Sequence, residues 1–157
     1  MNNNNGIFPF DIKYHLILDT AFKGILLPML KDLIRGRVRS SGYPCVSTII
    51  KRQFHDDIFP IESRPKFDFD QLEDFRLALR IVSQNKIDNC FDVKEAYLCN
   101  ELRKWGNIYV HRCIFSDDFV SNVLMTTKAM LKIVRTDLDI IEYCKTLEKI
   151  EQKLKLN

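Results

Sequence analysis

The stretch Ser116-Asp-Asp-Phe-Val-Ser-Asn-Val-Leu-Met-Thr-Thr-Lys-Ala-Met-Leu-Lys-Ile-Val134 is the clearest helical segment of the chain. Ser116 is a favoured N-cap residue, and the two aspartates that follow it suit the positive end of a helix dipole. The core-facing positions then recur with the helical period at Val120, Val123, Leu124, Thr127, Leu131 and Val134. This pattern predicts an amphipathic helix that packs one face against a core.

Two further helices are predicted upstream of this segment. The first runs from Asp70 to about Asn85, because apolar residues repeat along one face at Leu72, Phe75, Leu79 and Val82. The second begins at Asp92, whose spacing to Glu95 is that of a capping box, and it ends close to His111.

Helices are also predicted at both ends of the chain. Apolar residues from Phe10 to Ile34 follow the helical period, and Pro28 lies inside this run. Proline lacks the N–H group and its ring crowds the preceding turn, so we expect a bend near Leu27, or a division with Pro28 opening the second piece. Asp137 is expected to open the last helix.

The segment between Arg35 and Pro65 is rich in glycine and proline and predicts loops, with one short helix from about Val46 to Phe54. Charge changes sign around it. Residues 31–52 carry six basic residues and one aspartate, a net charge of +5, whereas residues 56–74 carry seven acids and two bases, a net charge of −5. Because strand-like alternation is missing, the sequence predicts an all-α bundle of four to six helices with an up-and-down core and an irregular basic and acidic insertion.

Length and composition fit one domain. The chain has 157 residues, 46% of them hydrophobic, and its formal net charge of +3 is too small to identify a nucleic-acid binder. We expect residues 1–6 to be a disordered asparagine-rich leader of a domain from a longer protein, and residues 7–157 to form a single helical domain. Charged residues interrupt the most apolar stretch, and a signal peptide is missing, so we expect no membrane association.

Familiar enzyme motifs are missing from the sequence. It contains neither a phosphate-binding P-loop nor a dinucleotide-binding glycine motif, and neither HExxH nor GxSxG. The five cysteines form no CxxC pair, which favours reduced thiols in an intracellular protein. None of the three histidines has a second ligand at metal-binding spacing. We therefore expect neither a metal site nor a cofactor.

The segment Gly106-Asn-Ile-Tyr-Val-His111 resembles the active motif of HEPN domains, a family of helical bundles associated with RNA cleavage. HEPN ribonucleases carry RNxxxH late in one helix, followed by a loop and a final amphipathic helix. Asn107 and His111 keep this spacing, and Gly106 replaces the arginine. The similarity covers residues 101–135 and is strongest to a HEPN branch at the C-terminal end of a nuclear endoribonuclease, where a PIN nuclease domain precedes it.

The resemblance implies a metal-independent cleavage in which the ribose 2′-hydroxyl attacks the adjacent phosphorus. Histidine transfers the proton, and arginine stabilises the charged transition state. Because Gly106 cannot supply the second effect, we expect the fragment itself to be non-catalytic. It is predicted to be the dimerisation and RNA-contact domain of a nuclear endoribonuclease in mRNA processing or quality control, with RNA and nuclear mRNA-export or processing factors as partners.

Two alternatives stay open. In the first, Arg103 or Arg112 replaces the missing arginine and works with His111 and Asn107 in an active metal-independent endoribonuclease. In the second, the chain is a helical scaffold that binds a protein partner. A structural role is also open for the motif, since a helix-end histidine is favoured by the helix dipole and Tyr109 suits core packing.

Gly106 also bears on assembly, because glycine inside a helix costs about 1 kcal/mol relative to alanine. This cost predicts the close approach of another helix, which the HEPN resemblance assigns to the partner subunit of a homodimer. A set of basic residues is expected to contact RNA phosphates: Arg35, Arg37, Arg39, Lys51 and Arg52. Alternatively, the acidic block downstream folds back and neutralises them.

Overall fold

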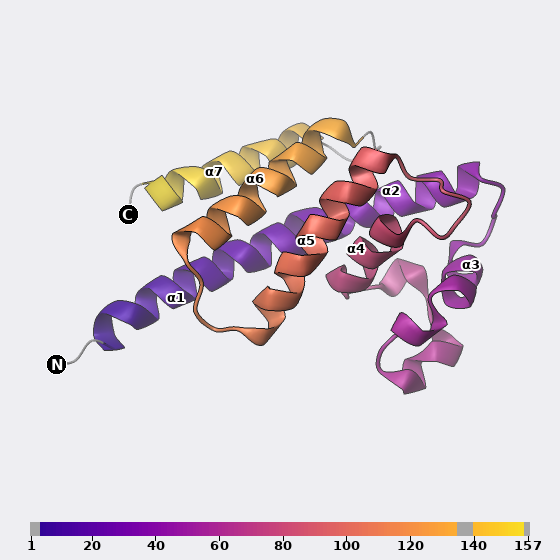
Figure 1. Ribbon diagram of the computed structural model, residues 1–157, viewed down its shortest axis with the longest axis horizontal. Coiled ribbons are helices and arrows are strands. Elements are labelled where there is room, and N and C mark those ends of the chain that lie inside the picture. Colours follow the sequence, from indigo (N-terminus) through magenta and orange to yellow (C-terminus); the bar gives the residue numbers. More distant parts are fainter. Residues whose placement is uncertain (1–3, 135–139, 156–157) are drawn as a thin grey trace.

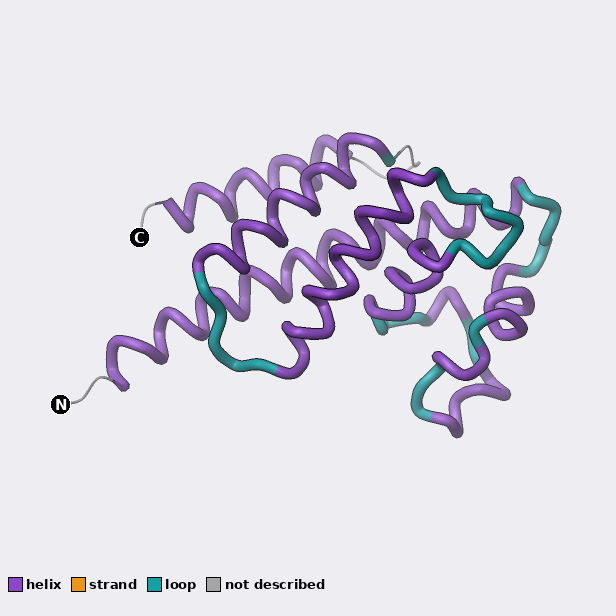
Figure 2. Tube along the Cα trace, viewed as in Figure 1, coloured by secondary structure: helices purple, strands orange, loops and turns teal. Residues whose placement is uncertain are grey.

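The computed structural model describes residues 4–134 and 140–155, and this part of the chain is an all-α bundle without strands (Figures 1 and 2). The predicted all-α class is therefore confirmed, although the described residues form seven α-helices and the sequence predicts four to six. Its α-helices are α1 (Asn4–Asp19), α2 (Leu27–Ser40), α3 (Val46–Gln53), α4 (Phe75–Gln84), α5 (Val93–His111), α6 (Asp117–Ile133) and α7 (Ile140–Lys155). Helix α1 extends to Asn4, into the predicted leader, whereas Asp137 lies outside the described residues.

The first long helix is divided where the sequence predicts. A π-helical segment, η1 (Thr20–Leu26), separates α1 from α2, and Pro28 lies in the first turn of α2. The Leu27 N–H bonds to the carbonyl of Phe22, five residues back, as in a π-helix. Pro28 has no N–H to give and would crowd the Gly24 carbonyl, so a wider turn at this point accommodates its ring. In Figure 1, α1 and α2 lie end to end along the molecule.

The predicted helix caps at α5 and α6 are present. The Asp92 N–H donates to Glu95 Oε1 at 2.9 Å in a capping box, and Ser116 Oγ accepts from the Phe119 N–H at 3.1 Å. Helix α4 begins later than expected because Asp74 is its N-cap and accepts from the Arg76 N–H at 3.0 Å. The residues before Asp74 form loops and short 3-10 turns instead.

Most of the helix packing in the bundle is between helices that follow one another in the chain. Helix α4 packs on α5, α5 on α6, and α6 on both α1 and α7. Figure 1 shows α5 and α7 running in the opposite direction to α1 and α6. Aromatic rings join these elements at the centre: the Phe22 ring centroid lies 4.8 Å from that of Phe75 and 5.4 Å from that of Tyr109. The Phe115 ring packs against that of Tyr109 in a tilted arrangement, with centroids 5.7 Å apart.

The irregular insertion lies at one end of the bundle (Figure 1). It contains α3 and three 3-10 turns, η2 (His55–Asp57), η3 (Ile61–Lys66) and η4 (Phe69–Gln71). Phe54 and Phe69 are fully buried and fix it to the bundle. Within the described ranges, no helix is both long and apolar enough to cross a bilayer.

Candidate functional site

The motif residues divide between two sides of α5. Arg103, Asn107 and His111 follow one another at intervals of about one helical turn, on a side that is half-buried at Arg103 and Asn107 and exposed at His111. Gly106 and Tyr109 lie on the buried side. Among the described residues, no hydrogen bond or ion pair involves the side chain of Asn107 or His111.

Gly106 is packed against its own chain. A Cβ atom at this position would lie 2.9 Å from Phe75 Cε2 and 3.6 Å from Phe22 Cε1. The predicted close approach is therefore real, but the neighbour is α4 of the same chain. The assignment of Gly106 to a dimer interface is wrong, because the residue is buried in the core. An arginine at this position would have to displace a stacked aromatic ring.

Arg103 is not directed at His111. Its Nη2 donates to Asn100 Oδ1 at 3.1 Å, so its guanidinium points towards the beginning of α5. His111 lies about 12 Å further along the helix axis. Arg112 is the extended residue after the helix end and is exposed beside His111. Of the two proposed substitutes for the missing arginine, only Arg112 is near the histidine.

Tyr109 connects α5 to α1 in a way that the sequence did not reveal. Its hydroxyl donates to Asp19 Oδ1 at 3.1 Å and lies 3.3 Å from His15 Nε2. Burial, together with the negative charge of Asp19, holds the pKa of Tyr109 well above its usual range. The hydroxyl is thus a neutral hydrogen-bond donor to Asp19, which also pairs with Lys23 at 3.1 Å.

Arg37 forms an ion pair within the fold that the sequence did not predict. Its Nη1 and Nη2 donate to the two carboxylate oxygens of Glu95, each at 2.8 Å, and Nη1 also bonds to the Cys90 carbonyl at 3.0 Å. Glu95 is only 1% exposed. This forked, charge-assisted pair fixes the end of α2 to the first turn of α5. Three of the N–H donors of Arg37 are thus used within the fold, and its contact with RNA stays a prediction.

The other predicted RNA-contact residues differ in whether they bind other groups of the same chain. Arg35 Nε pairs with Asp70 Oδ1 at 2.9 Å, so at this point the acidic block does fold back on the basic one. Lys51 Nζ donates to the Pro65 carbonyl at 3.0 Å. Arg39 and Arg52 are exposed. The basic surface that is open to a ligand is therefore smaller than the sequence indicates.

Among the described residues, no group of three or more His, Cys, Asp or Glu side chains is arranged to hold a metal ion. At the end of α5, the exposed His111 imidazole lies beside the exposed Arg112. Comparisons of the chain with protein-family models, with curated proteins and with solved structures found no match.

Proposed function

We propose that this chain is a non-catalytic HEPN-like domain that contacts RNA and assembles within a larger nuclear RNA-processing protein. The packing at Gly106 carries the first part of the proposal. In active HEPN ribonucleases, the equivalent arginine stabilises the charged transition state, and here Phe75 fills the space at 2.9 Å from where a side chain would begin. Position 106 therefore has no side chain that could stabilise the charge of the transition state.

The isolated position of His111 points in the same direction. A single histidine gives about 10²–10⁴-fold of general acid–base assistance, and it needs a partner group to reach enzymatic rates. In the part of the chain that is described, nothing orients the His111 imidazole, and the Arg103 guanidinium is bound to Asn100. An RNA could rest against His111 and Arg112 without being cleaved.

Cleavage is tested with purified protein and labelled single-stranded RNA in EDTA. We expect the RNA to stay intact, because the site has one proton-transfer group and no arginine at position 106. Cleavage that disappears in both His111→Ala and Arg112→Ala would overturn this part and establish the alternative, an active metal-independent endoribonuclease. The observation that favours this alternative is that His111 and Arg112 are adjacent and both exposed at the end of α5.

RNA contact is tested at Arg39 and Arg52, the exposed members of the predicted RNA-contact set. We expect Arg39→Glu and Arg52→Glu to weaken binding of labelled single-stranded RNA in fluorescence anisotropy and to reduce its salt dependence by about 0.7 per lost phosphate contact. Lys149→Glu is the matched control, because it makes the same charge change on an exposed position of α7. An equal loss in the control would show that only net charge matters.

Self-association also belongs to the proposal, although through a surface other than Gly106. Ile12 and Leu16 of α1 are 60% and 59% exposed and lie with Ile150 of α7 along an apolar groove of about 510 Å³. A second copy that covers this groove would remove that apolar area from water. We expect light scattering at micromolar concentration to give a dimer, and Leu16→Glu to give a monomer. A monomeric native protein would end this part of the proposal.

A further inference from the structure

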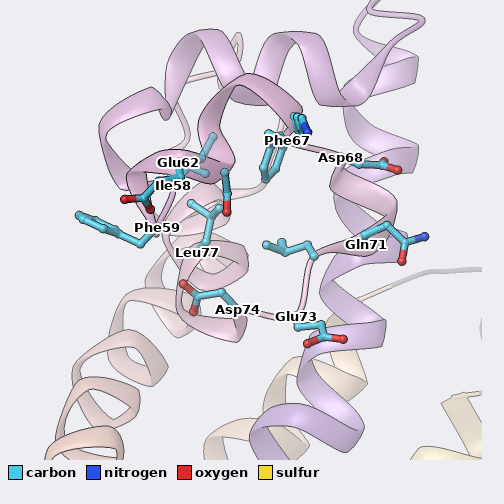
Figure 3. A pocket seen from close by; sticks show the side chains of 12 residues that line it. Ile58, Phe59, Glu62, Phe67, Asp68, Gln71, Glu73, Asp74 and Leu77 are labelled. Carbon is cyan, nitrogen blue, oxygen red and sulfur yellow. The ribbon is translucent and has the colours of Figure 1, made fainter.

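A cleft outside α5 combines an apolar floor with acidic edges. It has a volume of about 800 Å³ and lies where η3, η4 and the first turns of α4 meet (Figure 3). In Figure 3, four carboxylates surround the side chains of Phe67 and Leu77: those of Glu62, Asp68, Glu73 and Asp74. The glycine and proline residues before Pro65 predict mostly loop for part of this segment, and no local pattern indicates a cleft.

The floor offers a place for an apolar side chain. Ile58 and Leu77 are buried beneath it, and Leu72 is 9% exposed. Phe59 lies at one side of the cleft with 66% of its surface exposed, although phenylalanine is usually buried. A ligand with an apolar side chain would cover the exposed part of Phe59 and release the water from it.

The edges give the cleft a strong negative charge. Four acidic residues and one basic residue, Lys66, line it, a net charge of −3, although the whole chain carries +3. The charge is therefore local and opposite in sign to that of the molecule. Such a surface attracts cations and repels the phosphates of RNA.

Among the described residues, three of the four carboxylates have no cation within 4.0 Å, and only Asp74 has one. Asp68 and Asp74 accept hydrogen bonds from backbone N–H groups, each at 3.0 Å, and Asp74 also lies 3.6 Å from Arg76. Glu62 and Glu73 form no ion pair within 4.0 Å with any described residue. Lys31 acts on Glu73 through space, but its ammonium group is bound to backbone carbonyls.

We propose that this cleft binds a short basic segment of a partner protein. One apolar side chain of the segment enters the floor, and flanking arginine or lysine side chains pair with Glu62 and Glu73. Charge complementarity selects this occupant over RNA, and the apolar floor selects a peptide with alternating character over a simple polycation. The proposal uses none of the residues of α5 and is independent of whether the domain contacts RNA.

The experiment uses the full chain and a short fluorescein-labelled peptide of alternating arginine and leucine, followed by fluorescence anisotropy. We expect binding that weakens with salt. Peptides with glutamate in place of arginine, or serine in place of leucine, are expected to bind much more weakly. Equal binding of the serine peptide would show a merely acidic surface and overturn the cleft assignment.

Variants of the protein then locate the site. We expect Glu62→Gln with Glu73→Gln to weaken binding of the arginine–leucine peptide about fivefold, since each exposed charge pair contributes modestly. Glu148→Gln with Glu142→Gln, two exposed positions of α7, is the matched control. Both proteins should melt at the native temperature, because the substituted side chains are exposed. Equal affinities for the two proteins would contradict the proposal.

Discussion

Gly106 and Gly36 are both helical glycines, and they differ in what surrounds them. A Cβ at Gly106 would meet the Phe75 ring at 2.9 Å, whereas a Cβ at Gly36 would meet nothing within 4 Å. The Phe75 ring cannot easily move, because it is stacked on Phe22. The same residue type therefore has a packing role in α5 and none in α2.

Alanine substitutions at these two glycines are expected to affect stability differently. Gly36→Ala should raise the free energy of unfolding by about 0.4–1 kcal/mol, because alanine is the better helix former. Gly106→Ala should fail to gain this amount, and Gly106→Leu should lose about 1–3 kcal/mol through overpacking. Urea unfolding gives both values. If Phe75→Leu rescues Gly106→Ala, the contact is identified directly; stabilisation by Gly106→Ala alone would contradict it.

Tyr109 predicts a specific dependence of stability on pH. Burial and the negative charge of Asp19 raise the pKa of Tyr109 in the folded state. The native hydroxyl therefore stays neutral at about pH 10, where an unfolded tyrosine ionises. The stabilisation is fully present below that pH and is lost as pH rises above it. In the native protein, we expect this group to lower the free energy of unfolding by up to about 1.4 kcal/mol per pH unit. Tyr109→Phe should remove this pH dependence. Urea unfolding between about pH 9 and 11.5 measures the effect, and Tyr97→Phe, at an exposed position of α5, is the control.

At the scale of elements, the carboxylate of Glu95 connects two helices. It accepts from the Asp92 N–H within the capping box of α5, and it receives both amino groups of Arg37 from the end of α2. A local capping signal and a long-range ion pair therefore share one side chain. The capping box was predictable from spacing alone, but the choice of Arg37 as its partner depends on how α2 and α5 pack.

Removal of one partner from the Arg37–Glu95 ion pair is expected to destabilise the protein strongly. Arg37→Leu should lower the free energy of unfolding by about 3–5 kcal/mol, because it leaves a buried carboxylate without its cation. Arg37→Leu combined with Glu95→Leu should lose less than the sum of the two single variants. Arg39→Leu, at an exposed position of the same helix, should change stability by less than about 0.5 kcal/mol. Similar losses for Arg37→Leu and Arg39→Leu would exclude the structural role.

At the scale of the whole molecule, the helices share one core. Two cysteines, Cys99 and Cys45, differ in how deeply they are buried in it. Cys99 is fully buried in α5, where desolvation raises its pKa. Cys45 is exposed at the N-cap of α3, and the Thr48 hydroxyl, which donates to its Sγ at 3.0 Å, lowers its pKa. The two thiols should therefore differ strongly in reactivity in the native protein.

Thiol labelling with iodoacetamide should reveal this difference. We expect Cys45 to react in the native state, and Cys99 to react only through unfolding of the bundle, with a rate that rises with urea as steeply as global unfolding does. Mass spectrometry of the labelled peptides gives both rates. Fast native labelling of Cys99 would mean that α5 opens locally and that the core is not one cooperative unit.

The helical fold, most helix ends and the capping residues Asp92 and Ser116 were determined by the sequence itself, because they depend on side chains within a few residues of one another. The position of the motif late in a helix followed by another helix was predicted in the same way. Only the tertiary structure decided that Phe75 fills the space beside Gly106, that Arg37 belongs to Glu95, and that acidic residues surround an apolar cleft. Each of these contacts joins residues that are distant in the chain, and their partners are selected by packing geometry, which a local pattern of residue types does not encode.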